Sequence, residues 1–383
     1  MKYWIIKWHK AIAAILAFLI NSVGLVLSFL GLYSDSKFGE SKLFITIILC
    51  AAELFLIAAA IYSIISMMKD THNRVSVHEK EAEIIRYRDA GKTIFENSKA
   101  SVAYYKDFKD RLSILLSGHL DKLNEIRKLA TIIATGEVEP GPTKSSLEKY
   151  VEDSKITAHK ELKYEMIDLY SRFSINMINL VQESIEEYLR TKGCKKQVSI
   201  AFKQLNMPTK YKEIDDKKTN IYTAFRDQKT YHSKTRNETW KKSFCIRKNS
   251  DFVFSIERDY YIFNFVSRLL SENGLYLNEN TNFYEHYNSG VTCTIHSCKE
   301  KERVLYGFLA CDSLFDEKDK KNLGTNIYDY NVANILMSTA HIMALFFDEF
   351  LEKWDNYVKA CGTAEDDLCQ VMINRVNSSR YHG

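Results

Sequence analysis

Two places in the 383-residue sequence hold residue types that could do chemistry, and the first is a short cluster of metal-ligand residues. Cys293, His296 and Cys298 lie close together, and thiolate and imidazole groups are the usual ligands of structural zinc. A closed zinc site also needs a second ligand pair, and the sequence shows none at a matching spacing. The segment has the pattern of a strand, in which Cys293 and His296 point to opposite faces. We therefore expect no metal site.

The second place is Glu53, a single acidic residue inside an otherwise apolar run from Leu43 to Met68. An ionisable side chain within a membrane span is costly and usually faces protein or water. Asn21 and Ser22 lie at a similar depth in a preceding apolar run. Two interpretations stay open: the Glu53 carboxyl holds helices together by hydrogen bonds, or it lines a pore formed by several copies.

The two apolar runs predict a transmembrane helical hairpin over residues 1–69, with spans at about 11–33 and 43–68. A helix needs about 20 apolar residues to cross the hydrocarbon core, and both runs are long enough. Basic residues flank the two ends of the hairpin more heavily than its connecting loop, namely Lys2, Lys7, Lys10, Lys69 and Arg74. Because such residues favour the cytosolic side, we expect a multi-pass inner (cytoplasmic) membrane protein with both termini in the cytosol.

Residues 70–193 have helical periodicity, with a break at 135–144. The segment from Gly136 to Thr143 contains two of the three prolines of the chain. Apolar residues on either side recur at spacings of three and four, which defines one apolar stripe per helix. We predict a cytosolic helical hairpin or bundle whose stripes form a core.

Residues 194–357 mix short strand patterns with helices and predict an α+β domain, followed by a tail at 358–383. The expected strands are 198–205, 221–226, 243–248, 291–296 and 304–312, and the expected helices are about 256–271 and 331–357. The pair 291–296 and 304–312 is the strongest strand signal in the chain, because a short charged connection separates two apolar runs.

The stretch from Gly290 to His296, then Val304 to Ser313, then a long amphipathic helix, resembles the C-terminal half of a GAF domain. In that family, a strand pair with a small residue before the apolar core of its second strand leads into a last helix across the sheet. The segments 249–252 and 287–289 resemble parts of divergent members. The resemblance implies either a small-molecule pocket between the sheet and flanking helices, or a domain that dimerises and transmits strain. The Asn-Lys-Phe-Asp-Glu motif of the members that bind cyclic nucleotides is absent.

If a pocket is present, the resemblance places it among residues that combine aromatic walls with a few polar groups, as ligand sites often do. These candidates are Asp251, Phe252, Asn264, Asn278, Tyr287, Ser289 and Asp312. Structural roles also stay open, since Asp251 can cap a helix, Asn278 can shape a turn and Tyr287 can belong to the core. The basic run that includes Lys203 and Arg226 is diluted by acidic residues, and we expect it to be a solvated surface.

The sequence contains no phosphate-binding Gly-rich loop, no nucleophile elbow and no His-Glu-x-x-His motif, so we expect neither an enzyme nor a cofactor. The architecture resembles two-span membrane effectors of bacterial antiphage systems, including those of retrons. That resemblance implies a sensor and effector that disrupts the inner membrane when triggered. The alternative is a tethered sensor or scaffold that relays a signal to a separate protein. Expected partners are the lipid bilayer, further copies of the chain, a cytosolic regulatory protein or protein–nucleic acid complex, and a small-molecule ligand.

Overall fold

The chain forms two compact units, residues 1–85 and 86–383, which are described here one at a time. The computed structural model describes residues 41–135, 142–214, 219–231, 243–280, 282–297, 299, 303–315, 319, 324 and 326–361. The predicted first span at 11–33, with Asn21 and Ser22, lies outside the described residues.

A single helix, α2, runs from Ser41 to Ala134 and is 94 residues long. It includes the apolar run predicted as the second span as well as the first predicted cytosolic helix. The sequence of α2 contains no proline and only two glycines, Gly91 and Gly118, so nothing in it interrupts the helical hydrogen bonds. Glu53 lies within α2, and its side chain is outside the description.

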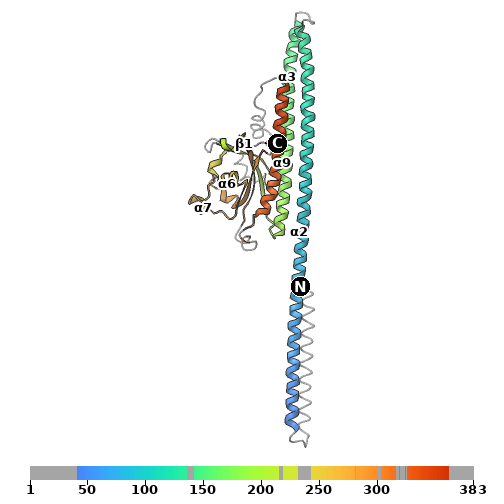
Figure 1. The fold of residues 1–383 in the computed structure, drawn as a ribbon, viewed down its shortest axis with the longest axis vertical. Helices are drawn as coiled ribbons and strands as arrows, with labels where there is room; N and C mark the ends of the chain where they lie inside the picture. The colour runs from blue at the N-terminus through green and yellow to red at the C-terminus, as the bar shows by residue number, and fades with distance from the viewer. Residues whose placement is uncertain are drawn as a thin grey trace. The chain divides into compact units, whose positions relative to one another are not determined.

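The second unit is built on a six-stranded antiparallel sheet with the strand order β3-β2-β1-β6-β5-β4. The fold is therefore α+β, as the sequence predicts (Figure 1). The strands are β1 Ser199–Lys210, β2 Asn220–Arg226, β3 Ser243–Cys245, β4 Tyr260–Phe263, β5 Ser289–His296 and β6 Val304–Ser313. The predicted pair β5–β6 is confirmed, with Val291 opposite Cys311 and Thr292 opposite Ala310.

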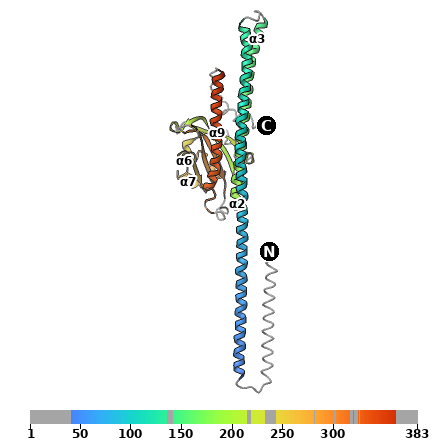
Figure 2. The same ribbon diagram turned by 45° about the vertical axis from the view of Figure 1, so that its right-hand side comes forward.

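Two long helices cover one face of this sheet: α3, Pro142–Thr191, precedes β1, and α9, Tyr330–Cys361, follows β6. The turned view in Figure 2 shows α9 passing across the sheet. Asp329 caps α9, because its Oδ1 accepts hydrogen bonds from the backbone N–H groups of Asn331 at 3.0 Å and Val332 at 3.2 Å.

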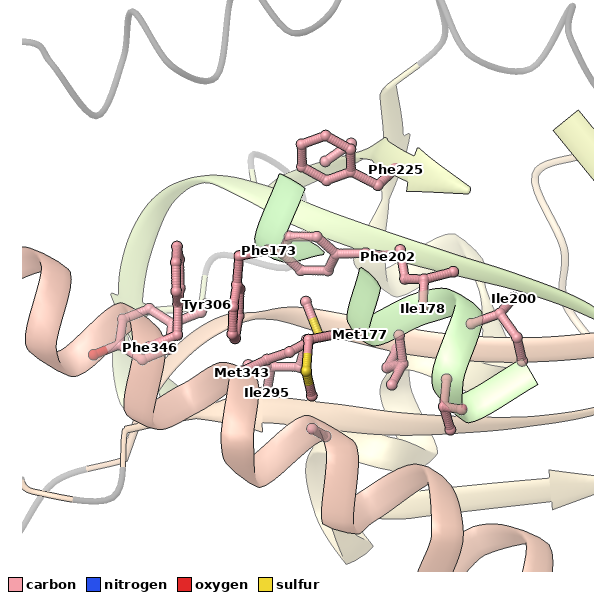
Figure 3. Packing of buried hydrophobic residues seen from close by; sticks show 14 of the residues in the cluster. Phe173, Met177, Ile178, Ile200, Phe202, Phe225, Ile295, Tyr306, Met343 and Phe346 are labelled. Atoms are coloured by element: carbon pink, nitrogen blue, oxygen red, sulfur yellow. The ribbon is translucent and has the colours of Figure 1, made fainter. Parts of the chain in front are cut away.

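By length and composition, one described helix, Tyr330–Ala360, could cross a membrane, and half of its most apolar window is buried within the fold. Its apolar residues pack on the sheet and on α3, as Met343 and Phe346 show in Figure 3. The helix therefore packs as a core helix does. A core helix can be as long and as apolar as a membrane span, because one of its faces is buried.

The core of the second unit is shared by α2, α3, α9 and the sheet. The ring of Phe346 from α9 stacks on Phe173 from α3, with centroids 4.3 Å apart, and lies 4.1 Å from the ring of Phe108 from α2. Tyr170 from α3 contacts Phe225 from β2 edge to face at 5.1 Å. The helical hairpin and the sheet thus pack against each other in one hydrophobic core.

The opposite face of the sheet carries short elements, chiefly α6, Ser250–Arg258, and α7, Arg268–Glu272. The expectation of one helix at about 256–271 is wrong. Asp259 adopts a left-handed backbone conformation with φ 67°, which ends α6. The aromatic run that follows forms the edge strand β4, in which Tyr260 lies opposite Cys293.

We predict that residues 86–361 unfold cooperatively as an isolated fragment, whereas residues 194–361 do not fold alone. Removing α2 and α3 takes away core partners of the sheet such as Tyr170, Phe173 and Met177 of α3, and the burial of each such side chain contributes about 1.5–3 kcal/mol. Circular dichroism during urea denaturation of both fragments measures this. Cooperative unfolding of the shorter fragment would instead support the sequence-based boundary at Cys194.

Candidate functional site

The sheet has one apolar face and one face with a polar centre. Side chains alternate along a strand, so Ile200 and Phe202 of β1 enter the shared core while Lys203 faces the other way. On that other face, Thr223 and Thr292 are buried, as is Arg226. A polar sheet face is ordinarily solvated, and here it is covered.

Two small apolar clusters cover the rim of the polar face. The first surrounds Phe252 of α6, whose ring lies 4.8 Å from that of Phe308. The second surrounds Phe263 of β4, whose ring lies 5.4 Å from that of Tyr276. Between the clusters lies a cavity of about 70 Å³. Its lining consists of Lys203, Arg226, Phe244, Asn249, Asp251, Phe252, Phe263, Asn278, Asn280, His286, Tyr287, Thr292, Ala310, Cys311 and Asp312.

The start of α6 is fixed over the cavity by side-chain hydrogen bonds. Asn249 donates from Nδ2 to the carbonyl of Cys245 at 2.8 Å and accepts from the backbone N–H of Glu279 at 3.1 Å. Ser255 donates to the carbonyl of Thr292 at 3.0 Å, which ties α6 to β5. These bonds hold the first turn of α6 rigidly above the polar face.

Asp251 occupies this first turn and is the most unusual residue of the cavity. Its side chain is only 8% exposed, and its Oδ1 atom has no hydrogen-bond partner. Burial raises the pKa of the Asp251 carboxyl to about 6, an effect that backbone N–H groups of α6 and the charge of Lys203 partly oppose. A buried acceptor without a donor costs about 1–3 kcal/mol, and more when it is charged. The fold thus retains a carboxyl group whose burial is unfavourable.

Positive charge lies on the sheet side of the same cavity. Lys203 donates from Nζ to Thr223 Oγ1 at 2.6 Å, and its ammonium lies 5.0 Å from the centre of the Phe244 ring. Arg226 donates to Ser199 Oγ at 2.8 Å and is 6% exposed. With Asp251 and Asp312, the lining therefore holds two cations and two carboxylates around one small space.

Five of the seven ligand-binding candidates line this cavity: Asp251, Phe252, Asn278, Tyr287 and Asp312. Asn278 donates to the Tyr287 hydroxyl at 2.5 Å, so these two candidates form one polar pair on the wall.

The other two candidates, Asn264 and Ser289, hold loops instead. Asn264 exchanges two hydrogen bonds with the backbone of Tyr328, at 3.0 and 3.1 Å. Ser289 accepts from the backbone N–H of Phe265 at 2.9 Å. Both residues thus fix the segment after β4 and lie outside the cavity lining.

Sequence reasoning missed the two cations, and the expectation that they belong to a solvated surface is wrong. Lys203 is half-buried and Arg226 is buried. The signal was the apolar run of Ser199–Lys210, in which Lys203 directly follows Ile200, Ala201 and Phe202 of the same strand. In the part of the chain that the structure describes, no three His, Cys, Asp or Glu side chains are placed to hold a metal ion. Cys298 lies outside that part, and the Cys293 thiol is directed to the carbonyl of Ala333 at 3.8 Å.

Neither a scan against protein-family models nor a search of curated proteins gives a match for this chain.

Proposed function

We propose that this protein is a non-enzymatic, membrane-anchored sensor whose cavity binds a small molecule and whose helix α2 carries the response toward the membrane. The observation that carries the proposal is the buried, unpartnered Oδ1 of Asp251 in a cavity that also contains Lys203 and Arg226. Buried polar atoms in native folds nearly always have a hydrogen-bond partner, so an unpartnered carboxylate oxygen beside a cavity marks a place where a donor can bind. A ligand that donates a hydrogen bond to Asp251 removes the cost of burial.

The fold supports the likeness to GAF domains. The pair β5–β6 leads into α9, which crosses the sheet, and the cavity lies between the sheet and α6 on the other face. A ligand pocket between the sheet and flanking helices is what the resemblance implies.

The membrane side of the proposal rests on sequence. The sequence predicts that residues 11–33 and 43–68 form a hairpin of the inner membrane with both termini in the cytosol. The second apolar run belongs to α2, and α2 also supplies Phe108 and Leu112 to the core that packs behind the sheet. Ligand binding at the sheet can therefore act on the hairpin through one unbroken helix. As an effector of antiphage defence, the hairpin would then disrupt the membrane.

The alternative is a tether or scaffold that relays the signal to a further copy of the chain, a regulatory protein or a protein–nucleic acid complex. Its support is a pair of exposed apolar side chains on one face of α2, Phe95 and Val102, which lie seven residues apart and are 61% and 56% exposed. Exposed apolar side chains of this size often mark protein contacts.

The experiment that tests the effector role compares wild type with Glu53→Leu and Glu53→Gln in cells overexpressing the full chain. A central acidic residue costs about 2.5–3.5 kcal/mol of insertion on translocon scales, so Glu53→Leu should accumulate in the membrane fraction at least as well as wild type. If the carboxyl lines an assembled pore, Glu53→Leu abolishes dye uptake. Glu53→Gln keeps dye uptake if the group only bonds helices together.

The matched control is Glu79→Leu, which removes an exposed acidic residue of the same helix and should leave dye uptake unchanged. A reporter fused after Gly383 should read cytosolic in every variant. Full dye uptake by Glu53→Leu would overturn the pore role. Wild type that accumulates in the membrane and never admits dye would favour the tether or scaffold.

A further inference from the structure

The size of the cavity limits what it can hold. A volume of about 70 Å³ is roughly five to seven times the space that one water molecule needs by the same measure. The aromatic side chains of Phe252, Phe263 and Tyr287 stand in its wall. A volume of this size matches a compact molecule rather than a whole nucleotide.

The charges of the lining limit the ligand further. Lys203 and Arg226 balance Asp251 and Asp312, so the formal charges of these four lining side chains sum to zero. Buried charge is tolerated only when it is paired. A phosphate would add two negative charges to a balanced site, and a simple amine would add a positive one. A molecule that carries one charge of each sign keeps the balance.

The arrangement also sets the orientation. Asp251 lies on the α6 side of the cavity, and its Oδ1 atom accepts no hydrogen bond there. Lys203 of β1, Arg226 of β2 and Asp312 of β6 all belong to the sheet, so the sheet side carries one net positive formal charge. From this geometry we infer that the ligand is a compact zwitterion of amino-acid size, with its ammonium group on Asp251 and its carboxylate toward Lys203 and Arg226. This inference rests on the proposed sensor function and names the ligand class for it.

The test is thermal unfolding of the full chain in lipid nanodiscs with single probes at millimolar concentration. The probes are the α-amino acids and the series glycine, β-alanine, 4-aminobutyrate and 5-aminovalerate. The one-charge counterparts are acetate, propionate, methylamine and ethylamine, and inorganic phosphate and a cyclic mononucleotide complete the set. At least one zwitterion should raise the midpoint in proportion to the logarithm of its concentration, and its one-charge counterparts should not.

Asp251→Asn should weaken binding of the active zwitterion about 30-fold or more, because it removes one partner of a buried charge pair. The matched control is Asp110→Asn, at an exposed position of α2, which should bind as wild type does. Equal binding of the zwitterion by Asp251→Asn would overturn the assignment of the ammonium to Asp251.

A second measurement separates the ligand class from the sensor function. Small molecules released by heat from the purified full chain are identified by mass spectrometry. A retained zwitterion supports both proposals. If phosphate, the nucleotide or a one-charge probe stabilises the protein instead, the ligand class is wrong and the sensor function stands. If no molecule is retained and no probe raises the midpoint, both proposals fail.

Discussion

Replacing Asp251 with asparagine is expected to make the protein more stable at pH 7.5, although Asp251 lies at the centre of the candidate site. Burial raises the pKa of this carboxyl from an ordinary 3.8 to about 6. A pKa difference of one corresponds to about 1.4 kcal/mol. Ionised Asp251 therefore lowers the free energy of unfolding by roughly 3 kcal/mol at neutral pH, and Asp251→Asn should recover most of it. For a unit of this size, the midpoint should rise by several degrees.

The stability difference between Asp251→Asn and wild type should depend on pH. The folded protein binds the Asp251 proton more tightly than the unfolded chain does, so the stabilisation from this proton is full below pH 3.8. It is lost as the pH rises through about 6. The stability difference between Asp251→Asn and wild type should thus be small at pH 4 and reach its full size above pH 7.

The charged and titratable groups that act on Asp251 come from several elements: Lys203 of β1 and Asp312 of β6, with Tyr261 and Tyr276 nearby. None of them is altered in Asp251→Asn, so the comparison isolates the carboxyl. Thermal unfolding at pH 4, 5.5 and 7.5 measures the difference, with Asp110→Asn as the control at an exposed site. If Asp251→Asn is less stable than wild type at all three pH values, the Asp251 carboxylate stabilises the first turn of α6 and the argument for a ligand is lost.

The parts of the fold that could be predicted from sequence are those where one face is strongly apolar. Helix α9 and the pair β5–β6 have regular periodicity over many residues, and their burial in the shared core follows that periodicity. The break before α3 could be predicted because prolines cluster there. In these elements, local preference and tertiary packing agree.

The segment 250–272 could not be predicted, because its structure depends on neighbours distant in sequence. The aromatic run of β4 has apolar residues at positions that fit a helix as well as a strand. It forms a strand because it pairs with the edge of β5, with Tyr260 opposite Cys293 and Phe263 opposite Gly290. Short apolar runs are ambiguous in this way until their pairing partner is known.

The candidate site was predicted in part. The resemblance to GAF domains pointed to five lining residues in separate segments, among them Asp251 at the start of α6 and Asp312 of β6, but not to the two cations. Lys203 and Arg226 come from strands β1 and β2, and only the sheet brings them opposite α6. The sequence predicted a solvated surface for them, because acidic residues lie between the basic ones. In the structure, the alternation of side chains in the strands directs them into the covered polar face.

The last prediction concerns Gly307, at the centre of the sheet, where the small residue of the strand pair has a steric role. A Cβ atom added there would lie 2.2 Å from the carbonyl oxygen of Lys203 and 3.0 Å from the Phe202 ring. The closest atom belongs to the backbone of β1, which cannot move aside as a side-chain end could. Gly307 pairs with Gln204 of β1 and with Ile295 of β5, so two strand pairings depend on this close approach.

Gly307→Ala is therefore expected to force β1 away from β6. Overpacking of a tight site alone costs about 1–3 kcal/mol. Because strand pairing is lost as well, the free energy of unfolding should fall by about 3 kcal/mol or more. The matched control is Gly118→Ala in α2, where an added Cβ meets nothing within 4 Å. That change should stabilise the helix by about 0.5–1 kcal/mol. The yield and thermal midpoint of the two purified variants measure both effects. Wild-type stability of Gly307→Ala would show that β1 and β6 separate more easily than their register indicates, and the polar face that they form would then not be a rigid floor for a ligand.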